Sequence, residues 1–365
     1  MRYIVLLFVL LFHIPCLSEK VYSASSGRGK SVLLKHIPLA DTEKSVRKIF
    51  SLSIPGYPGA YNPSIVNLEQ GFLLSFRYDD LRRNKSMVGM VRLNRRFEVV
   101  GSPVLSDTLL ELEDMRLFWI EGVLYASGTR VEIRSPTRTA IALCQVDVQT
   151  LKLKNAVDLM YHPQQVEKNW TPLVHSNSSG KTDLFYIYSH NPQHVLRVKS
   201  ISTGAIEHAI LPWSQKGLSW EHKWGAIRGG TPCVSIGDER LEFFHSSFND
   251  KNRRWWVFGA MTFENSPPFR IKAISQYPIM AQGMYTTPLV PRFKKRTFRV
   301  AFPGGFVEVK KKKKTLFYLV YGENDSGIKV MVLDKKRLLA SMKKVPYSER
   351  PYSSAPYRGS SKVRR

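Results

Sequence analysis

The chain has 365 residues, of which 43% are hydrophobic and 12% aromatic, so it can bury a sizeable core and is not disordered over most of its length. Lysine and arginine number 55 against 29 aspartates and glutamates, which gives a formal net charge of +26. Such an excess is typical of proteins that contact polyanions, anionic membrane surfaces or acidic glycans, and also of soluble proteins that are simply basic throughout.

A secretory signal peptide is predicted at the start of the chain. Met1 and Arg2 precede an apolar run over residues 3–12, and Pro15 then stands before small residues near Ser18. A basic start, a short apolar run and a helix-breaking proline are typical of a signal peptide, and the run is short for a membrane span. We therefore expect residues 1–18 to be a signal peptide, and the protein to be secreted or to reside in a lumenal or periplasmic compartment.

Residues 19–50 are expected to form an N-terminal extension. Helical periodicity is scarce in the whole chain, and 42–50 and 335–343 are the two segments that show it.

From residue 51 to residue 345 one unit recurs five times, as an apolar run, a short polar turn and a second apolar run. The first runs begin with the segments 61–66, 113–118, 169–174, 230–234 and 302–307. Marker residues in these segments recur every 52 to 72 residues. Short strands repeated at this spacing predict an all-β fold, a five-bladed β-propeller over residues 51–345, followed by a flexible basic tail over 346–365. A β-sandwich of five hairpins is the alternative, but it would not require similar turn chemistry before each first strand.

In a propeller, the loops that lead into the inner strands surround the central axis at one end. The residues at these positions are Asn62, Asp114, the Lys168-Asn169-Trp170 segment, Arg228 with Thr231, and the Pro303-Gly304-Gly305 turn. Polar, charged and aromatic side chains that converge from five blades predict a central funnel site for a polar ligand.

These segments resemble the five-bladed β-propeller glycosidase superfamily, most closely glycoside hydrolase family 130, which contains mannoside phosphorylases and β-mannosidases. The resemblance covers roughly residues 57–334 in the same order. The matching segments are Asn62-Pro63-Ser64 with a strand ending at Arg77, Glu113-Asp114-Met115-Arg116, Lys168-Asn169, Thr231-Pro232 with a strand ending at His245, Phe302-Pro303-Gly304-Gly305, and Tyr321-Gly322-Glu323-Asn324-Asp325.

The resemblance implies an enzyme that cleaves or transfers a mannoside-like glycosyl unit of an oligosaccharide or glycan. Asp114 matches the family's catalytic aspartate, a general acid for the glycosidic oxygen. The neighbouring Glu113 would raise the pKa of Asp114 through its like charge, whereas Arg116 would lower it. Funnel geometry and resemblance together give these substrate-binding candidates: Asn62, Arg77, Arg116, Lys168, Asn169, Trp170, Arg228, Thr231, His245 and Asp325.

The reaction type stays open between several alternatives. Lys168 and Asn169 lie where the phosphorylases bind phosphate, so phosphate is a candidate partner, but His190 ends the strand where those enzymes carry an arginine. Hydrolysis would need a second carboxylate as base, for which the sequence offers Asp325 and Glu264. A glycosyltransferase is a third alternative. A lectin-like propeller that binds glycans without catalysis is the alternative from another class.

The remaining chemistry is expected to be sparse. Apart from Cys16 in the signal segment, the cysteines are Cys144 and Cys233, which fall in blades two and four, so we expect two free thiols. The sequence has no CxxC or HExxH motif, and we expect no metal site and no cofactor. The basic tail is expected to make at most weak contact with anionic surfaces, and no specific nucleic-acid binding is expected.

Overall fold

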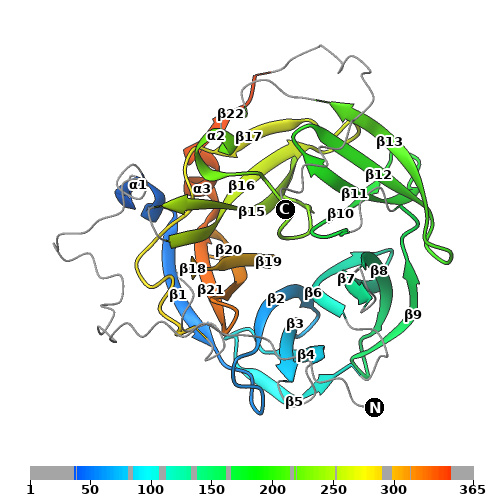
Figure 1. The fold of residues 1–365 in the computed structure, drawn as a ribbon, viewed down its shortest axis with the longest axis horizontal. Helices are drawn as coiled ribbons and strands as arrows, with labels where there is room; N and C mark the ends of the chain where they lie inside the picture. Colours follow the sequence, from blue (N-terminus) through cyan, green and yellow to red (C-terminus); the bar gives the residue numbers. More distant parts are fainter. Residues whose placement is uncertain are drawn as a thin grey trace, which may run out of the picture.

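The computed structural model describes residues 37, 39–80, 85–106, 112–132, 138–161, 166–213, 218, 220–250, 253–289, 298–312 and 314–346. The expected signal peptide and the basic tail beyond residue 346 lie outside the described residues. Five sheets, antiparallel apart from the short pairing of β16 with β18, surround a central axis (Figure 1), which confirms the five-bladed β-propeller.

Each blade is built mainly from strands that follow one another along the chain. Blade one contains β2 (Tyr61–Leu68), β3 (Gly71–Asp80), β4 (Lys85–Leu93) and β5 (Val99–Leu105). Blade two contains β6 (Leu112–Ile120), β7 (Val123–Glu132), β8 (Arg138–Asp147) and β9 (Lys152–Asp158). Blade three contains β10 (Thr171–Ser176), β11 (Thr182–His190), β12 (Gln193–Ser200) and β13 (Ala205–Trp213).

The last two blades recruit strands from elsewhere in the chain. Blade four contains β14 (Val234–Ser235), β15 (Glu239–Asp250), β16 (Arg253–Glu264) and β17 (Ile271–Ser275), joined by β18 (Phe298–Arg299) and β22 (Met342–Lys344). Blade five contains β19 (Ala301–Lys311), β20 (Lys314–Glu323), β21 (Gly327–Asp334) and β1 (Val46–Leu52). The helices are short: α1 (Leu39–Glu43), α2 (Trp220–Trp224) and α3 (Lys335–Ser341).

Strand β1 closes the ring. It pairs antiparallel with β21, from Val46 opposite Leu333 to Leu52 opposite Ile328, as the fourth strand of blade five. The propeller therefore begins before residue 51. The helix expected over 42–50 is wrong for residues 46–50, because pairing with β21 overrides the local periodicity. The second expected helix is confirmed as α3, which begins after the N-cap Asp334.

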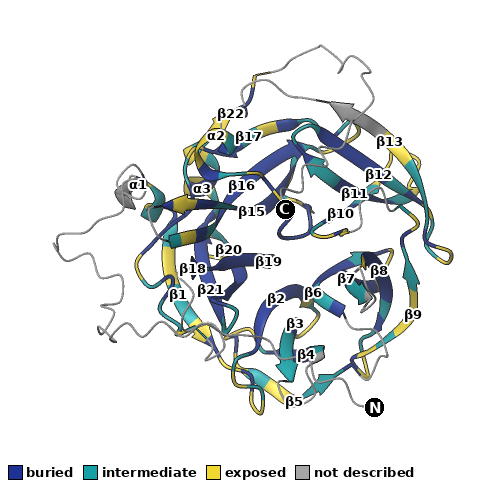
Figure 2. Ribbon diagram, viewed as in Figure 1, coloured by how far each residue is buried: buried dark blue, intermediate teal, exposed yellow. Residues whose placement is uncertain are grey.

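The hydrophobic core lies between the blades rather than at one centre. Phe72 and Val307 belong to a cluster that joins blades one and five, and Tyr186 and Leu143 belong to one that joins blades two and three. The inner strands are largely buried, whereas exposed residues gather on the outer strands (Figure 2). This packing fixes the inner strands, and therefore the side chains at their ends, around the axis.

Blade four has an irregular inner edge. The strand expected over 230–234 is regular only at Val234–Ser235, although Arg228 and Thr231 still form backbone hydrogen bonds with β15. A Cβ atom at Gly230 would lie 2.0 Å from the carbonyl oxygen of Phe243, so only glycine allows this close approach.

Two further expectations concern the cysteines and the membrane. Cys144 and Cys233 are buried and free, as expected. No helix within the described part of the chain has the length and apolarity that crossing a bilayer requires.

Candidate active site at the mouth of the propeller axis

Three residues at the starts of the inner strands share an unusual backbone conformation. Asn62, Asp114 and Asn169, in blades one, two and three, have φ angles of 43°, 54° and 60°. Asparagine and aspartate are the non-glycine residues that adopt this left-handed region most readily. At Asn62 and Asp114 the strand register also shifts, as in a β-bulge. The repeated conformation explains why the sequence places these short polar residues at equivalent positions.

Blade five approaches this region closely. A Cβ atom at Gly322 would lie 2.1 Å from Oδ1 of Asn62 and 2.6 Å from its backbone nitrogen. Only glycine lets the end of β20 pack against the start of β2, so the matching Gly322 shapes the mouth without contributing a side chain.

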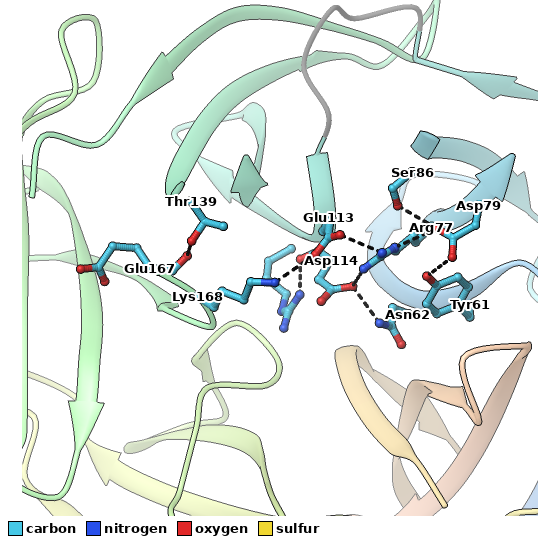
Figure 3. A network of polar contacts seen from close by, with 11 residues as sticks. Tyr61, Asn62, Arg77, Asp79, Ser86, Glu113, Asp114, Thr139, Glu167 and Lys168 are labelled. Carbon is cyan, nitrogen blue, oxygen red and sulfur yellow. Dashed lines mark hydrogen bonds and ion pairs between the residues drawn. The ribbon is translucent and has the colours of Figure 1, made fainter. Parts of the chain in front are cut away.

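Five side chains at this end of the axis form a connected network, which we call the mouth cluster: Asn62, Arg77, Glu113, Asp114 and Lys168. Asn62 Nδ2 donates a 2.7 Å hydrogen bond to Asp114 Oδ1. Arg77 Nη2 donates to Glu113 Oε1 at 2.8 Å, and its Nη1 lies 3.6 Å from Asp114 Oδ1. Lys168 Nζ donates to Glu113 Oε2 at 3.2 Å, so the neighbouring blade three joins the cluster (Figure 3).

Arg77 is anchored on its other side by blade one. Its Nε lies 3.3 Å from Asp79 Oδ1, and the Tyr61 hydroxyl donates a 2.8 Å hydrogen bond to Asp79 Oδ2. The guanidinium also lies over the Tyr61 ring, 5.1 Å from its centroid. Arg77 is therefore fixed in place and divides its charge among three carboxylates, as Figure 3 shows.

The surroundings of Asp114 determine its charge. Burial raises the pKa of Asp114, but the positive charges of Arg77 and Arg116 lower it. The hydrogen bond from Asn62 and the charge of Lys168 lower it further, so that its pKa lies below the ordinary value of 3.8. Asp114 is consequently a carboxylate at neutral pH.

This direction is opposite to the one expected from Glu113. The two neighbouring carboxylates do repel, but Glu113 is itself neutralised by Arg77 and Lys168. These two cations therefore offset much of the repulsion by which Glu113 would raise the pKa of Asp114.

Deeper along the axis lies a second network, which we call the axial cluster: Arg116, Thr171, His190 and Glu242. Glu242 is fully buried and accepts hydrogen bonds from Thr171 Oγ1 at 2.7 Å, His190 Nε2 at 2.9 Å and the Gly230 backbone at 3.2 Å. Arg116 donates to the carbonyl oxygens of Gly230 and Asp114. Its guanidinium lies over Phe302, 4.9 Å from the ring centroid. The cluster links blades two to five.

Three predicted substrate-binding residues are enclosed by protein. Trp170 packs in the core between blades two and three, and its indole nitrogen donates to Glu167 Oε2 at 3.2 Å. The Thr231 hydroxyl accepts from the backbone of Phe243 at 3.0 Å. His245 is buried and donates from Nδ1 to the Gly229 carbonyl at 2.9 Å. Burial and the nearby arginines lower the pKa of His245 to about 3, so its ring is neutral.

The other predicted residues lie closer to solvent. Arg228 is exposed at the start of the inner segment of blade four, and Asn169 is half-buried. Asp325 is half-buried in the turn after β20, at the same end of the propeller as Asn62. Glu264, the other candidate base, is wrong for that role: it ends β16 at the opposite end of the axis and pairs with Arg270 at 3.4 Å.

Glu242, the central acceptor of the axial cluster, was not among the site residues predicted from the sequence. It is a lone carboxylate inside the apolar run Leu241–His245 of β15. A charged residue in the middle of a buried strand is a signal for a satisfied internal network, and this signal could have located the axial cluster.

Comparison with known proteins identifies structural neighbours. No protein-family model matches the chain, and no curated protein matches it. A mannose phosphorylase from Leishmania mexicana, solved with a phosphate ion, has a TM-score of 0.58 at 16% identity, covering 86% of this chain and 96% of its own. A GDP-Man-dependent mannosyltransferase from the same organism has a TM-score of 0.53 at 14% identity. The match covers 80% of this chain and 90% of the mannosyltransferase. A candidate glycoside hydrolase from Bacteroides ovatus has a TM-score of 0.54 at 15% identity. The match covers 81% of this chain and 94% of the hydrolase. The five-bladed propeller of this chain is thus the fold of these phosphorylase, mannosyltransferase and glycoside hydrolase structures.

Proposed function

We propose that this protein is a carbohydrate-active enzyme that cleaves or transfers a mannoside-like glycosyl unit, with Asp114 as the group that exchanges a proton with the substrate. The observation that carries the proposal is the half-buried Asp114 carboxylate at the mouth of the axis, oriented by Asn62 and Arg77. The mannose phosphorylase and the mannosyltransferase among the structural neighbours support the choice of sugar.

The ionised state of Asp114 decides the order of the proton transfers. A carboxylate can accept a hydrogen bond from a sugar hydroxyl and take its proton, but it cannot donate one first. Asp114 therefore acts as an acid toward the glycosidic oxygen only after it has taken up a proton from solvent, and the leaving hydroxyl then carries that proton away. Arg77 and Asn62 hold the carboxylate in one orientation throughout.

Two contacts favour transfer or hydrolysis over phosphorolysis. Lys168, a candidate for binding phosphate, is paired with Glu113. His190, which stands where the phosphorylases carry an arginine, is sealed below the mouth against Glu242. An incoming phosphate would have to compete with Glu113 for Lys168, and it would not reach His190, which is buried against Glu242.

The test is an activity assay with the purified full chain on manno-oligosaccharides, alone, with phosphate, and with GDP-Man as donor. Asp114→Asn keeps the size of the side chain but removes its basicity, so we expect kcat/KM to fall by about 10²- to 10⁴-fold. Asp183→Asn is the matched control, because Asp183 also pairs with an arginine, Arg197 at 2.8 Å, but lies outside the mouth cluster. It should retain full activity.

The alternative outcomes separate the rival functions. Turnover that Asp114→Asn leaves unchanged would remove Asp114 from the chemistry. Binding of manno-oligosaccharides without turnover in any arm would indicate a lectin-like propeller instead. Sugar 1-phosphate that forms only when phosphate is present would restore the phosphorylase interpretation.

A further inference from the structure

A cavity of about 480 Å³ lies at the opposite end of the axis from Asp114. Every blade contributes a segment of its inner edge to the lining, so the cavity is central to the propeller. Its walls are mainly apolar and include Ile65, Leu117, Trp119, Pro232 and Phe306. A cavity of this size with apolar walls is typical of sites for small organic molecules.

One corner of the cavity is polar and carries a positive charge. Arg240 lines the cavity and is only 5% exposed. Its Nη1 donates to the Val174 carbonyl at 2.8 Å, and its Nε donates to the Asn265 carbonyl at 3.0 Å. Its Nη2 lies 3.3 Å from Nδ1 of His175. All three partners are neutral acceptors.

The charge of Arg240 has no counterion in the part of the chain that the structure describes. None of the lining residues is acidic, and no described carboxylate lies within ion-pair distance of this guanidinium. Burying a cation without a counterion is costly. Burial indeed lowers the pKa of Arg240. Three of its five N–H groups have partners, which leaves two to donate.

We propose that this cavity binds a small amphiphilic carboxylate, whose hydrocarbon tail occupies the apolar walls and whose carboxylate pairs with Arg240. The Asn265 side chain, which also lines the cavity, stands at the same polar corner. A carboxylate fits a guanidinium through two parallel hydrogen bonds, and the pair would supply the missing counterion. A neutral alcohol of the same length would fill the cavity but leave the charge uncompensated.

This site is separate from the mouth cluster. Along β6, Asp114 and the nearest cavity-lining residue, Leu117, are three residues apart, which is about 10 Å in an extended strand. Arg116 and Glu242 of the axial cluster lie between the two ends. The inference therefore does not depend on the proposed glycosyl chemistry, and either can fail without the other.

The test is isothermal titration calorimetry of the purified full chain with decanoate, with 1-decanol as the uncharged probe and acetate as the probe without a tail. We expect one decanoate per chain, bound at least about tenfold more tightly than decanol, because charge-assisted hydrogen bonds add roughly that much. Acetate should not bind measurably. Equal affinities for decanoate and decanol would overturn the role of Arg240.

Two variants locate the binding. Arg240→Met should abolish the preference for decanoate over decanol. Because this change also removes two contacts to backbone carbonyls, a second variant leaves Arg240 intact: Val234→Trp places a large ring at the exposed rim of the cavity. We expect Val234→Trp to weaken decanoate binding at least about tenfold while thermal unfolding stays cooperative. Decanoate binding that survives Val234→Trp unchanged would show that the ligand sits elsewhere and would overturn the proposal.

Discussion

The mouth cluster and the axial cluster are built from the same kinds of side chain, but they differ in what remains unsatisfied. In the axial cluster Glu242 is fully buried and has three hydrogen-bond donors. In the mouth cluster Lys168 is 40% exposed and Asp114 18% exposed. Oδ1 of Asn62 has no hydrogen-bond partner within the described residues. A sealed network holds blades together, whereas a network whose charged groups have access to solvent can also receive a ligand.

The largest effect is expected when the carboxylate is removed from the axial cluster. Glu242→Ala leaves Thr171, His190 and Arg116 without their acceptor or counter-charge in a buried site. We expect the free energy of unfolding to fall by about 3–5 kcal/mol, measured by urea denaturation. Glu242→Gln keeps one carbonyl acceptor and should cost clearly less. A loss below about 1 kcal/mol for Glu242→Ala would mean that the axial cluster does not hold the blades together.

A smaller effect is expected from the cation of the mouth cluster. Arg77→Met leaves Asp79, Glu113 and Asp114 without their shared counter-charge in a half-buried site, so we expect a loss of about 2–3 kcal/mol in the free energy of unfolding. Lys168→Met is the control, because Lys168 is more exposed and, within the described part of the chain, has Glu113 as its single ion-pair partner. It should cost less than about 1 kcal/mol. If Arg77→Met and Lys168→Met lowered the free energy of unfolding by similar amounts, the half-buried Arg77 would contribute no more to stability than the exposed Lys168.

The smallest effect concerns the pH dependence that Asp114 confers. Its pKa is lower in the folded protein than its ordinary value of 3.8, so the folded state favours the carboxylate. This stabilisation is fully present above about pH 5 and is lost as the pH falls through the folded-state pKa, below 3.8. The difference in unfolding free energy between the wild type and Asp114→Asn should therefore stay flat from about pH 7 to pH 5 and shrink below pH 4. A difference that instead grows as the pH falls from 7 to 5 would show that the pKa of Asp114 is raised.

Local patterns in the sequence were sufficient to predict the five blades and the polar residues that begin the inner strands at the mouth of the axis. The turn residues Asn62 and Asp114 mark the starts of inner strands because few other residue types tolerate their backbone conformation. The sign of the Asp114 pKa shift could not be read in the same way. It depends on Arg77 and Lys168, which lie in other blades and meet Asp114 only once the ring is formed.

Burial was equally hard to foresee at single positions. Trp170 lies at the mouth in the sequence pattern, yet its ring packs into the core between two blades. Strand β1 was missed because its partner, β21, is distant in sequence, so no local periodicity reveals the pairing. The burial of Trp170 and the pairing of β1 both depend on contacts between segments far apart along the chain, which local sequence patterns do not predict.

The closure of blade five by β1 has a consequence during synthesis. A ribosome produces Val46–Leu52 first and β21 only about 280 residues later, which at about 5–20 residues per second is a delay of roughly 15–60 s. During that interval β1 has no native partner, and blade five cannot be completed by any nascent chain that stops before β21. The ring can therefore close only after nearly the whole propeller has been translated. A prematurely terminated chain would leave a strand edge unpaired, and chaperones and proteases could recognise it.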